Sequence, residues 1–274
     1  MSNNQHFNLK RICSIYYSPT GTTRKTVAAI ASGTGLNSRQ LFENNLTFPE
    51  FADSLIDVEP EDLLVIGAPV YAGRIASEAF RRMEKIRFAA NPVVLVAVYG
   101  NRHYDDALVD LREFALGQGL KPVAAGAFVG EHSYSNQKYP IAIGRPDADD
   151  LASAKAFGSE IFARFNKIED LLNLPGLNLP GTVPLPERRV IPPAAAETIA
   201  ERCVKCGKCQ EICPTGAVYF AKGYKTKPEL CTLCCACLKK CPQHARVINS
   251  DHLQMVRERL LADCVTRREA ETFF

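Results

Sequence analysis

Short apolar runs alternate with helical patterns through the first 170 residues of the chain. The apolar runs that predict buried strands are 11–17, 62–67, 92–98 and 123–129, with a weaker one at 38–42. Apolar positions at helical spacing predict helices over 22–31, 77–85, 105–116 and 147–172. This alternation predicts an α/β fold with a doubly wound parallel sheet of five strands.

The pattern breaks between residues 173 and 196, where six prolines occur. Proline-rich chains favour extended polyproline geometry, so we expect a semi-rigid linker here. Beyond residue 250, Leu253, Val256, Leu260 and Cys264 share one helical face, which predicts a packing helix. The expected division of the chain is 1–172 for the sheet domain, 173–196 for the linker, 197–250 for a cysteine-rich unit and 251–274 for a helical tail.

Nine of the eleven cysteines lie between residues 203 and 241. They form two runs, CVKCGKCQEICP from residue 203 and CTLCCACLKKCP from residue 231. The N-terminus lacks an apolar signal segment, so we expect a cytoplasmic protein whose clustered cysteines bind metal rather than form disulfides. Zinc ribbons use separated cysteine pairs, whereas two complete runs of this spacing are typical of iron–sulfur clusters.

In the two-cluster arrangement, the fourth cysteine of each run binds the cluster of the other run. The predicted ligands are therefore Cys203, Cys206, Cys209 and Cys241 for one [4Fe–4S] cluster, and Cys231, Cys234, Cys237 and Cys213 for the second. Cys235 is an extra thiol within the second run, and we expect it to be an unligated neighbour rather than a swapped ligand. The two runs resemble bacterial-type ferredoxins, which implies a small α+β fold.

A hydroxyl-rich turn with one glycine follows the first predicted strand and precedes the first predicted helix. Backbone N–H groups at a helix N-terminus, together with hydroxyl groups, can bind an oxyanion. The turn lacks the lysine of nucleoside-triphosphate loops and the glycines of dinucleotide fingerprints. The candidate phosphate-binding residues are Ser18, Pro19, Thr20, Gly21, Thr22 and Thr23.

Two further loops follow later strands at the same edge of the sheet, where open α/β sheets bind ligands. Each loop offers glycine for close backbone approach and an aromatic side chain for stacking on a flat ring. The candidate residues are Pro69, Val70, Tyr71, Ala72 and Gly73 in one loop and Tyr99, Gly100, Asn101 and Tyr104 in the other. Ordinary packing of the tyrosines stays open as the alternative. The long polar loop 131–146 is expected to cover the ligand or to meet the cysteine-rich unit.

Sheet domain, proline linker and two-cluster unit, in this order, resemble the flavodoxin–ferredoxin fusion proteins of anaerobic metabolism. The resemblance covers nearly the whole chain and rests on the cysteine runs, SPTGTT, PVYAGR and the YGNR stretch. It implies a flavodoxin-like fold that binds FMN, with Tyr71 and Tyr104 flanking the flavin ring. It further implies that backbone groups of Gly73, Gly100 and Asn101 contact the polar edge of the ring.

Charge is distributed unevenly along the chain. Residues 1–174 carry a net −2, whereas residues 197–250 carry a net +5. A basic segment is also a feature of nucleic-acid binding, but each oxidised cluster with four thiolates contributes roughly −2 and offsets the excess. We therefore expect redox partner proteins and no nucleic acid. No apolar run reaches the roughly 18 residues of a membrane span.

These observations predict an electron-transfer protein. It would relay low-potential electrons between two [4Fe–4S] clusters and bound FMN, and on to a partner. No nucleophile–base pair or acid–base pair of carboxylates stands out, so no catalytic residue is predicted and the oligomeric state is left open. The alternatives are a flavin-dependent reductase of a small molecule fed by the clusters, and a redox-sensing or interaction protein without flavin.

Overall fold

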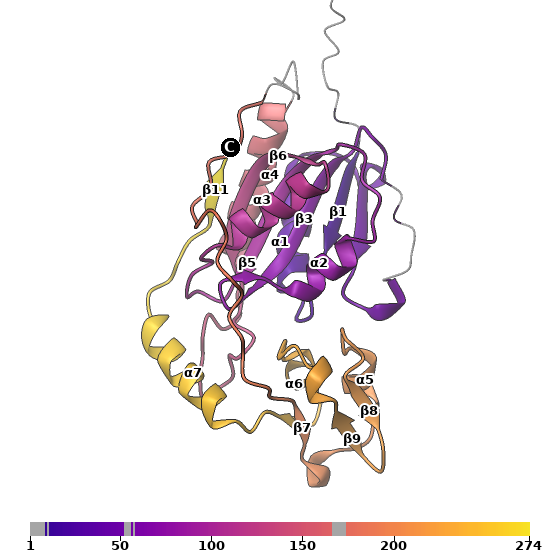
Figure 1. Cartoon of the computed structure of the whole chain (residues 1–274), viewed down its shortest axis with the longest axis vertical. Helices are drawn as coiled ribbons and strands as arrows, with labels where there is room; N and C mark the ends of the chain where they lie inside the picture. The colour runs from indigo at the N-terminus through magenta and orange to yellow at the C-terminus, as the bar shows by residue number, and fades with distance from the viewer. Residues whose placement is uncertain (1–8, 10, 52–55, 57, 166–173) are drawn as a thin grey trace, which may run out of the picture.

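The computed structural model describes residues 9, 11–51, 56, 58–165 and 174–274 of the 274-residue chain. An α/β sheet domain forms the upper part of the molecule in Figure 1, and the smaller cysteine-rich unit lies beneath one edge of the sheet. The linker and the C-terminal segment run along the sheet domain and join the two parts. Among the described residues, no helix has the length and apolar character to cross a membrane.

Five parallel strands form the centre of the sheet, in the spatial order β2-β1-β3-β5-β6. Their bounds are Ile12–Tyr16 for β1, Leu41–Asn45 for β2, Leu63–Tyr71 for β3, Pro92–Tyr99 for β5 and Lys121–Val129 for β6. This is the flavodoxin-like strand order, so the predicted fold class is confirmed. Two short antiparallel strands extend the sheet beyond the five expected: β4, Arg74–Ile75, pairs with β3, and β11, Glu271–Phe273, pairs with β6.

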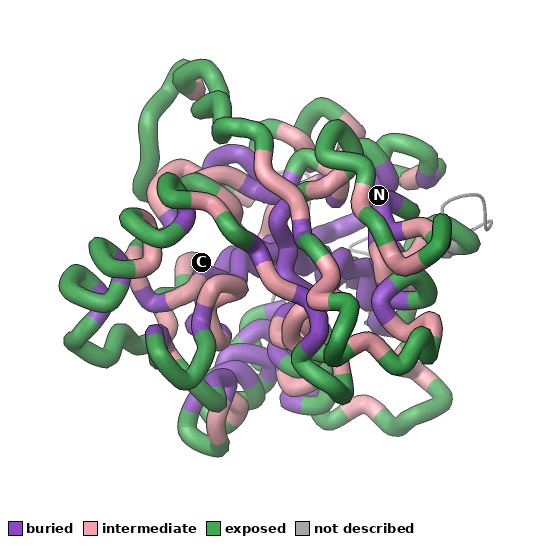
Figure 2. The backbone as a smooth tube through the Cα atoms, turned by 90° about the horizontal axis from the view of Figure 1, so that it is seen from below, coloured by how far each residue is buried: buried purple, intermediate pink, exposed green. Residues whose placement is uncertain are grey.

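Helices cover both faces of the sheet. On one face α1 (Thr22–Gly33) and α4 (Ala148–Phe165) bury aliphatic and aromatic side chains against the strands, and on the other face α2 (Ser77–Met83) and α3 (Ala107–Gly117) do the same. Figure 2 shows the buried residues gathered in the interior, with exposed residues outside them. The apolar runs that predicted the strands are buried because each strand has helices on both sides.

The helices α1 and α4 are in backbone contact. A Cβ atom at Gly158 would overlap the carbonyl oxygen of Ile30, and one at Gly33 would overlap the carbonyl oxygen of Lys155. The Ser159 hydroxyl also donates a hydrogen bond of 2.7 Å to the Gly33 carbonyl oxygen. Two glycines at the crossing therefore set how closely the helices approach.

Several element boundaries differ from the prediction. Residues 38–40 form a 3-10 turn, which Asn37 caps through its side chain, and the edge strand follows at 41–45. The strand β3 continues past Gly67 to Tyr71, because residues 68 and 69 still pair with β5 and residues 70 and 71 pair with β4. The helix predicted over 147–172 is α4 as far as Phe165, and residues 166–172 lie outside the described part.

The linker is packed against the sheet domain and is not a free spacer. Leu177 and Leu179 are buried in the core cluster beside α3. Arg112 donates to the Leu177 carbonyl oxygen at 3.2 Å, and Arg74 donates to the Pro186 carbonyl oxygen at 2.8 Å. The extended, proline-rich linker therefore lies along the sheet domain and buries its leucines there.

The cysteine-rich unit is internally duplicated with a period of 28 residues. The helices α5 (Lys208–Glu211) and α6 (Ala236–Lys239) are 28 residues apart, and so are the 3-10 turns at 200–202 and 228–230. Left-handed backbone recurs at the same period, at the pairs 205 and 233, 207 and 235, and 216 and 244. The remaining elements are the hairpin of β8 (Val218–Phe220) with β9 (Tyr224–Thr226) and the pair of β7 (Glu197–Thr198) with β10 (Arg246–Val247).

The C-terminal segment is more than a helical tail. The helix α7, Asp251–Asp263, buries Leu253 and Leu260, and Val256 is partly buried, as the helical stripe predicts. After Cys264 the chain turns back and adds β11 to the edge of the sheet beside β6. The sequence stretch is too short and too polar to signal this strand by its own pattern.

Candidate cofactor sites

The eight cysteines predicted as ligands line two cavities in the cysteine-rich unit. One cavity, here called the outer cavity, is lined by Cys203, Cys206, Cys209 and Cys241. The other, here called the inner cavity, is lined by Cys213, Cys231, Cys234 and Cys237. The structure thus brings the fourth cysteine of each run to the three of the other run, the grouping that a crossed pair of clusters requires.

The chemistry of these cavities fits a cubane. Among the described residues, no three His, Cys, Asp or Glu side chains converge closely enough to hold a single metal ion. A cubane of four irons is larger than one ion, and its thiolate ligands stand apart around it. Burial raises the pKa of the Cys234 thiol to about 12 and that of Cys237 to about 11, so these thiolates need a cationic partner, which iron supplies.

Cys235 lies beside the inner cavity. It corresponds to Gly207 in the first copy, and both residues have left-handed backbone, with φ of 59° and 82°. Its thiol is buried and donates to the Leu233 carbonyl oxygen at 3.4 Å. The side chain also lines the inner cavity next to four other cysteines, so its role as an unligated neighbour stays a prediction.

A buried arginine, Arg246, lies next to both groups of cysteines. The side chain is 4% exposed, lines the outer cavity, and its positive charge favours the thiolates of both Cys209 and Cys237. It donates to the hydroxyls of Thr198 and Thr226, and to the Ala196 carbonyl oxygen at 3.0 Å. Arg246 thus joins three short strands and places a cation where the anionic clusters are expected.

The hydroxyl-rich turn lies at the C-terminal end of β1 and opens α1. Gly21 precedes the helix with φ of 93°, and there is open space where its Cβ would be. The Ser18 hydroxyl accepts from the Arg24 N–H at 3.0 Å, and the Ser18 N–H donates to the Thr47 hydroxyl at 2.8 Å. The Thr23 hydroxyl is buried and lacks a hydrogen-bond partner among the described residues. A helix N-terminus with an unused hydroxyl fits a phosphate group.

The first flavin loop is a β-hairpin turn. Pro69, Val70 and Tyr71 belong to β3, and Ala72 and Gly73 form the turn with φ of 52° and 84°. The Tyr71 side chain points toward the cysteine-rich unit and packs on the cluster around Cys234. Burial, followed by the nearby Cys234, raises the pKa of Tyr71 well above its usual value, so its phenol stays protonated.

In the second flavin loop, Tyr104 is enclosed by its neighbours. Tyr104 is 1% exposed. Its ring stacks on His103 at 4.9 Å and meets Tyr99 edge-on at 5.5 Å, and its hydroxyl donates to Glu271 at 2.7 Å. The C-terminal segment and the neighbouring rings thus enclose Tyr104, and its stacking on the flavin stays a prediction.

Asn101 holds the C-terminal segment through its side chain. The amide donates to the carbonyl oxygens of Cys264 and Thr266, at 3.0 and 2.9 Å, and accepts from Arg145 and from the Arg268 N–H. Its backbone has φ of 64°, which asparagine tolerates better than most residues. The predicted contact of its backbone with the flavin stays a prediction, while its side chain has a structural role that the sequence did not indicate.

Close contacts also fill the space beside Gly73 and Gly100. A Cβ at Gly73 would overlap the Asp105 carboxylate, and one at Gly100 would overlap the His132 ring. His132 belongs to the 131–146 loop, and burial lowers the pKa of its imidazole to about 4. The His132 Nδ1 accepts from the Tyr134 N–H at 3.0 Å, so the neutral ring carries its proton on Nε2.

The inner cavity faces the carboxyl ends of the strands of the sheet domain, where the predicted phosphate and flavin loops lie. Phe48 and Tyr71 of the sheet domain pack on Ile212, Cys234 and Ala236 of the cysteine-rich unit. The 131–146 loop meets the unit as one of its two expected roles requires, since Tyr134 packs beside the inner cysteines and Lys239 forms an ion pair with Glu131. The buried guanidinium of Arg82, from α2, donates to the Leu46 and Pro214 carbonyl oxygens and bridges the two parts.

Comparison with known proteins agrees with this architecture. The sequence matches the flavodoxin domain family over residues 14–140 and the 4Fe-4S binding domain family over residues 196–219. An uncharacterized ferredoxin of Methanocaldococcus jannaschii is 34% identical over 53 residues, which are 18% of this chain and 69% of that protein. The chain belongs to the flavodoxin–ferredoxin fusion proteins. Its cofactors are accordingly FMN in the flavodoxin domain and [4Fe–4S] in the ferredoxin domain, and its role is in electron transfer or redox chemistry.

Solved structures resemble the flavodoxin domain only distantly. A flavodoxin from the domain Archaea is 15% identical, covers 57% of this chain and 98% of its own, and gives a TM-score of 0.38. The rubredoxin oxygen:oxidoreductase of the anaerobe Desulfovibrio gigas is 11% identical, covers 62% of this chain and 39% of its own, and gives 0.40. Both scores are below 0.5, so the assignment of the fusion protein rests on strand order and the family matches.

Proposed function

We propose that this flavodoxin–ferredoxin fusion protein passes electrons between two [4Fe–4S] clusters and FMN within one chain, and exchanges them with a redox partner. The observation that carries the proposal is the contact of the inner cysteine cavity with the flavodoxin domain. Cys234 lies in one apolar cluster with Phe48 and Tyr71, at the edge where the predicted flavin loops end. A cluster bound by Cys234 would therefore be separated from the flavin loops by packed side chains and not by solvent.

The cofactors supply complementary chemistry, since FMN takes up one or two electrons whereas each cluster passes one. Contacts between the two domains hold the two cofactor sites in a fixed arrangement. Arg82 connects the flavodoxin helix α2 with Pro214 beside the inner cavity, and Lys239 connects α6 with Glu131 and with the Ser135 carbonyl oxygen. These buried and half-buried contacts support electron transfer between docked domains, and not transfer that waits for a freely moving ferredoxin domain to meet the flavodoxin domain.

The contact of the inner cysteine cavity with the flavodoxin domain favours electron transfer over reduction of a small molecule. A flavin reductase needs open space above the flavin ring for its substrate. Here Ile212 and Cys234 of the ferredoxin domain pack against Tyr71 of the first flavin loop. The loop residues around Gly100 are likewise covered by His132. This arrangement supports the transfer role.

Transient kinetics of the anaerobic holoprotein test the proposal. Photoreduced 5-deazariboflavin, a small uncharged donor, is generated by a light flash, and the cluster and flavin absorbances are followed. We expect the clusters to be reduced first and the flavin to follow at a rate that does not depend on protein concentration, because both sites are in one chain. A flavin rate proportional to protein concentration would refute transfer within the chain.

A further inference from the structure

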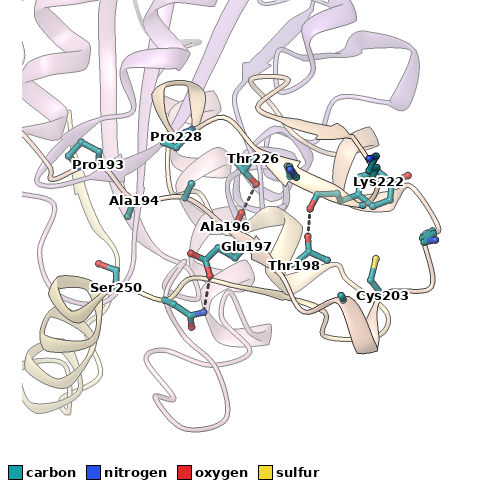
Figure 3. A pocket seen from close by; sticks show the side chains of 17 residues that line it. Pro193, Ala194, Ala196, Glu197, Thr198, Cys203, Lys222, Thr226, Pro228 and Ser250 are labelled. Atoms are coloured by element: carbon teal, nitrogen blue, oxygen red, sulfur yellow. Dashed lines mark hydrogen bonds between the residues drawn. The ribbon is translucent and has the colours of Figure 1, made fainter.

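A large groove lies at the side of the ferredoxin domain that faces away from the flavodoxin domain. Its volume is about 820 Å³, and it runs between residues 193–198 and the β8–β9 hairpin (Figure 3). Hydrogen bonds of 2.5 Å, from the Thr198 hydroxyl to the Tyr224 carbonyl oxygen and from the Thr226 hydroxyl to the Ala196 carbonyl oxygen, tie the two walls together. Cys203, which also lines the outer cysteine cavity, is part of the groove lining.

Three lysines give the groove a positive charge. Lys205, Lys222 and Lys225 line it, and all three are exposed. Within the described part of the chain, none of their ammonium groups forms a hydrogen bond or an ion pair. The carboxylate of Glu197 is the acidic group of the lining, and it accepts from the Asn249 amide at 2.9 Å. The charge of the lysines is thus left for a partner outside the chain.

The two cysteine cavities differ in their access to solvent. The inner cavity is covered by the flavodoxin domain through Phe48 and Tyr71. At the outer cavity Cys206 is exposed, and its neighbour Val204 is 62% exposed. Of the eight predicted cluster ligands, Cys206 alone is exposed, so a redox protein can bring its own centre closest to the outer cysteines.

We propose that the groove with its three lysines is the docking site for an acidic redox protein. Carboxylates of that protein pair with Lys205, Lys222 and Lys225, and its redox centre lies beside Cys203. In the transfer step the partner is oxidised by one electron and the outer cluster is reduced by one electron, with no bond or proton exchanged. The proposal rests on the proposed function for this step, whereas docking itself can be measured without electron transfer.

Binding of an oxidised, acidic two-[4Fe–4S] ferredoxin to the full holoprotein tests the docking site, with calorimetry at low and at physiological ionic strength. The variant K205E/K222E/K225E reverses the groove charge. The control R39E/K121E/K155E changes the net charge equally at exposed or half-exposed positions of the flavodoxin domain. Iron and flavin contents confirm that both variants are folded.

We expect the groove variant to bind the acidic ferredoxin at least roughly tenfold more weakly, and its residual binding to depend less on salt. The control should bind within about twofold of wild type at physiological ionic strength, where charges beyond the Debye length are screened. Equal weakening by both variants would overturn the proposal. So would displacement of the ferredoxin by single-stranded DNA at lower concentration, because the groove would then be a nucleic-acid site.

A kinetic arm separates this proposal from the function on which it rests. The groove variant should lose flavin reduction by the reduced acidic ferredoxin but keep the wild-type rate with photoreduced 5-deazariboflavin. Retention of the full rate with the acidic ferredoxin would overturn the docking site. If the wild-type flavin is reduced by neither donor through the clusters, the proposed function fails, and the calorimetric result alone decides the docking site.

Discussion

Replacing Asn101 by alanine should release the C-terminal segment from the flavodoxin domain. The Asn101 side chain is 4% exposed and makes four hydrogen bonds, two to carbonyl oxygens at 264 and 266 and two from Arg145 and the Arg268 N–H. Beyond these contacts the chain continues into β11, which pairs with β6. One buried amide therefore anchors a strand that begins only a few residues later.

The free energy lost in N101A can be worked out from these contacts. A hydrogen bond contributes a net free energy of about 1 kcal/mol, and the three that reach the segment, at residues 264, 266 and 268, would give about 3 kcal/mol. Water can replace part of this at the exposed residues 266 and 268, while alanine at φ of 64° costs about 1 kcal/mol more than asparagine. We expect a loss of about 3 kcal/mol, which corresponds to an increase on the order of 100-fold in the open population of the segment.

Hydrogen exchange of the β11 amides measures this opening directly. In N101A, exchange at residues 271–273 should accelerate on the order of 100-fold, and in N101G, which lacks the backbone strain of alanine, the acceleration should be several-fold smaller. The variant N37A is the matched control, because Asn37 is an exposed capping residue at the other end of the domain. Unchanged exchange at residues 271–273 in N101A would refute the anchoring role.

Four further changes have defined outcomes. The variant G158A should lower the free energy of unfolding by about 1–3 kcal/mol in urea denaturation, because a methyl group would overlap the Ile30 carbonyl oxygen, whereas G117A in open space should leave it unchanged or raise it. Burial keeps the pKa of His132 at about 4, below the usual value of about 6.5, so the unfolded chain binds more protons than the folded chain between these pH values. The free energy of unfolding should therefore fall as the pH drops from about 6.5 toward 4. In H132Q the unfolding midpoint should fall less over this range, and an identical fall would contradict the burial argument. Removal of the iron should unfold residues 197–250 while the sheet domain stays protected in hydrogen exchange, because the ferredoxin domain has only small groups of buried apolar side chains. Protection of both parts would show that the iron–sulfur clusters are not needed for folding. The variant R246M should lower the reduction potentials of both clusters in redox titration, because it removes a buried cation next to Cys209 and Cys237, and the exposed-site control K240M should change them less.

The parallel sheet and the grouping of cysteines were accessible from sequence for clear physical reasons. A strand covered by helices on both faces is apolar at nearly every position, and such runs mark β1, β3, β5 and β6 directly. The cysteine runs have a fixed spacing, because each short loop can bring only three thiolates to one cluster. The duplication seen in the backbone, down to left-handed residues 28 positions apart, follows the duplication in the sequence.

The contacts between distant segments were not accessible from sequence. Glu271–Phe273 becomes a strand because β6 offers an unpaired edge, and three residues carry no periodicity of their own. Arg246 and Arg82 lack any motif, and their importance arises from burial, which only the folded chain reveals. Tyr104 fits the expected stacking position along the chain, but Glu271 and two neighbouring rings enclose it.

The central claim is that two clusters with crossed cysteine ligands deliver electrons to FMN through the inner one. Electron paramagnetic resonance of the reduced variants C213A, C234A and C206A, combined with flash reduction of their flavin, tests it most directly. The account predicts that C213A and C234A disturb the same centre and both lose rapid flavin reduction, while C206A disturbs the other centre. If C213A instead disturbs the centre that C206A disturbs, or if rapid flavin reduction persists without the inner centre, the account is contradicted.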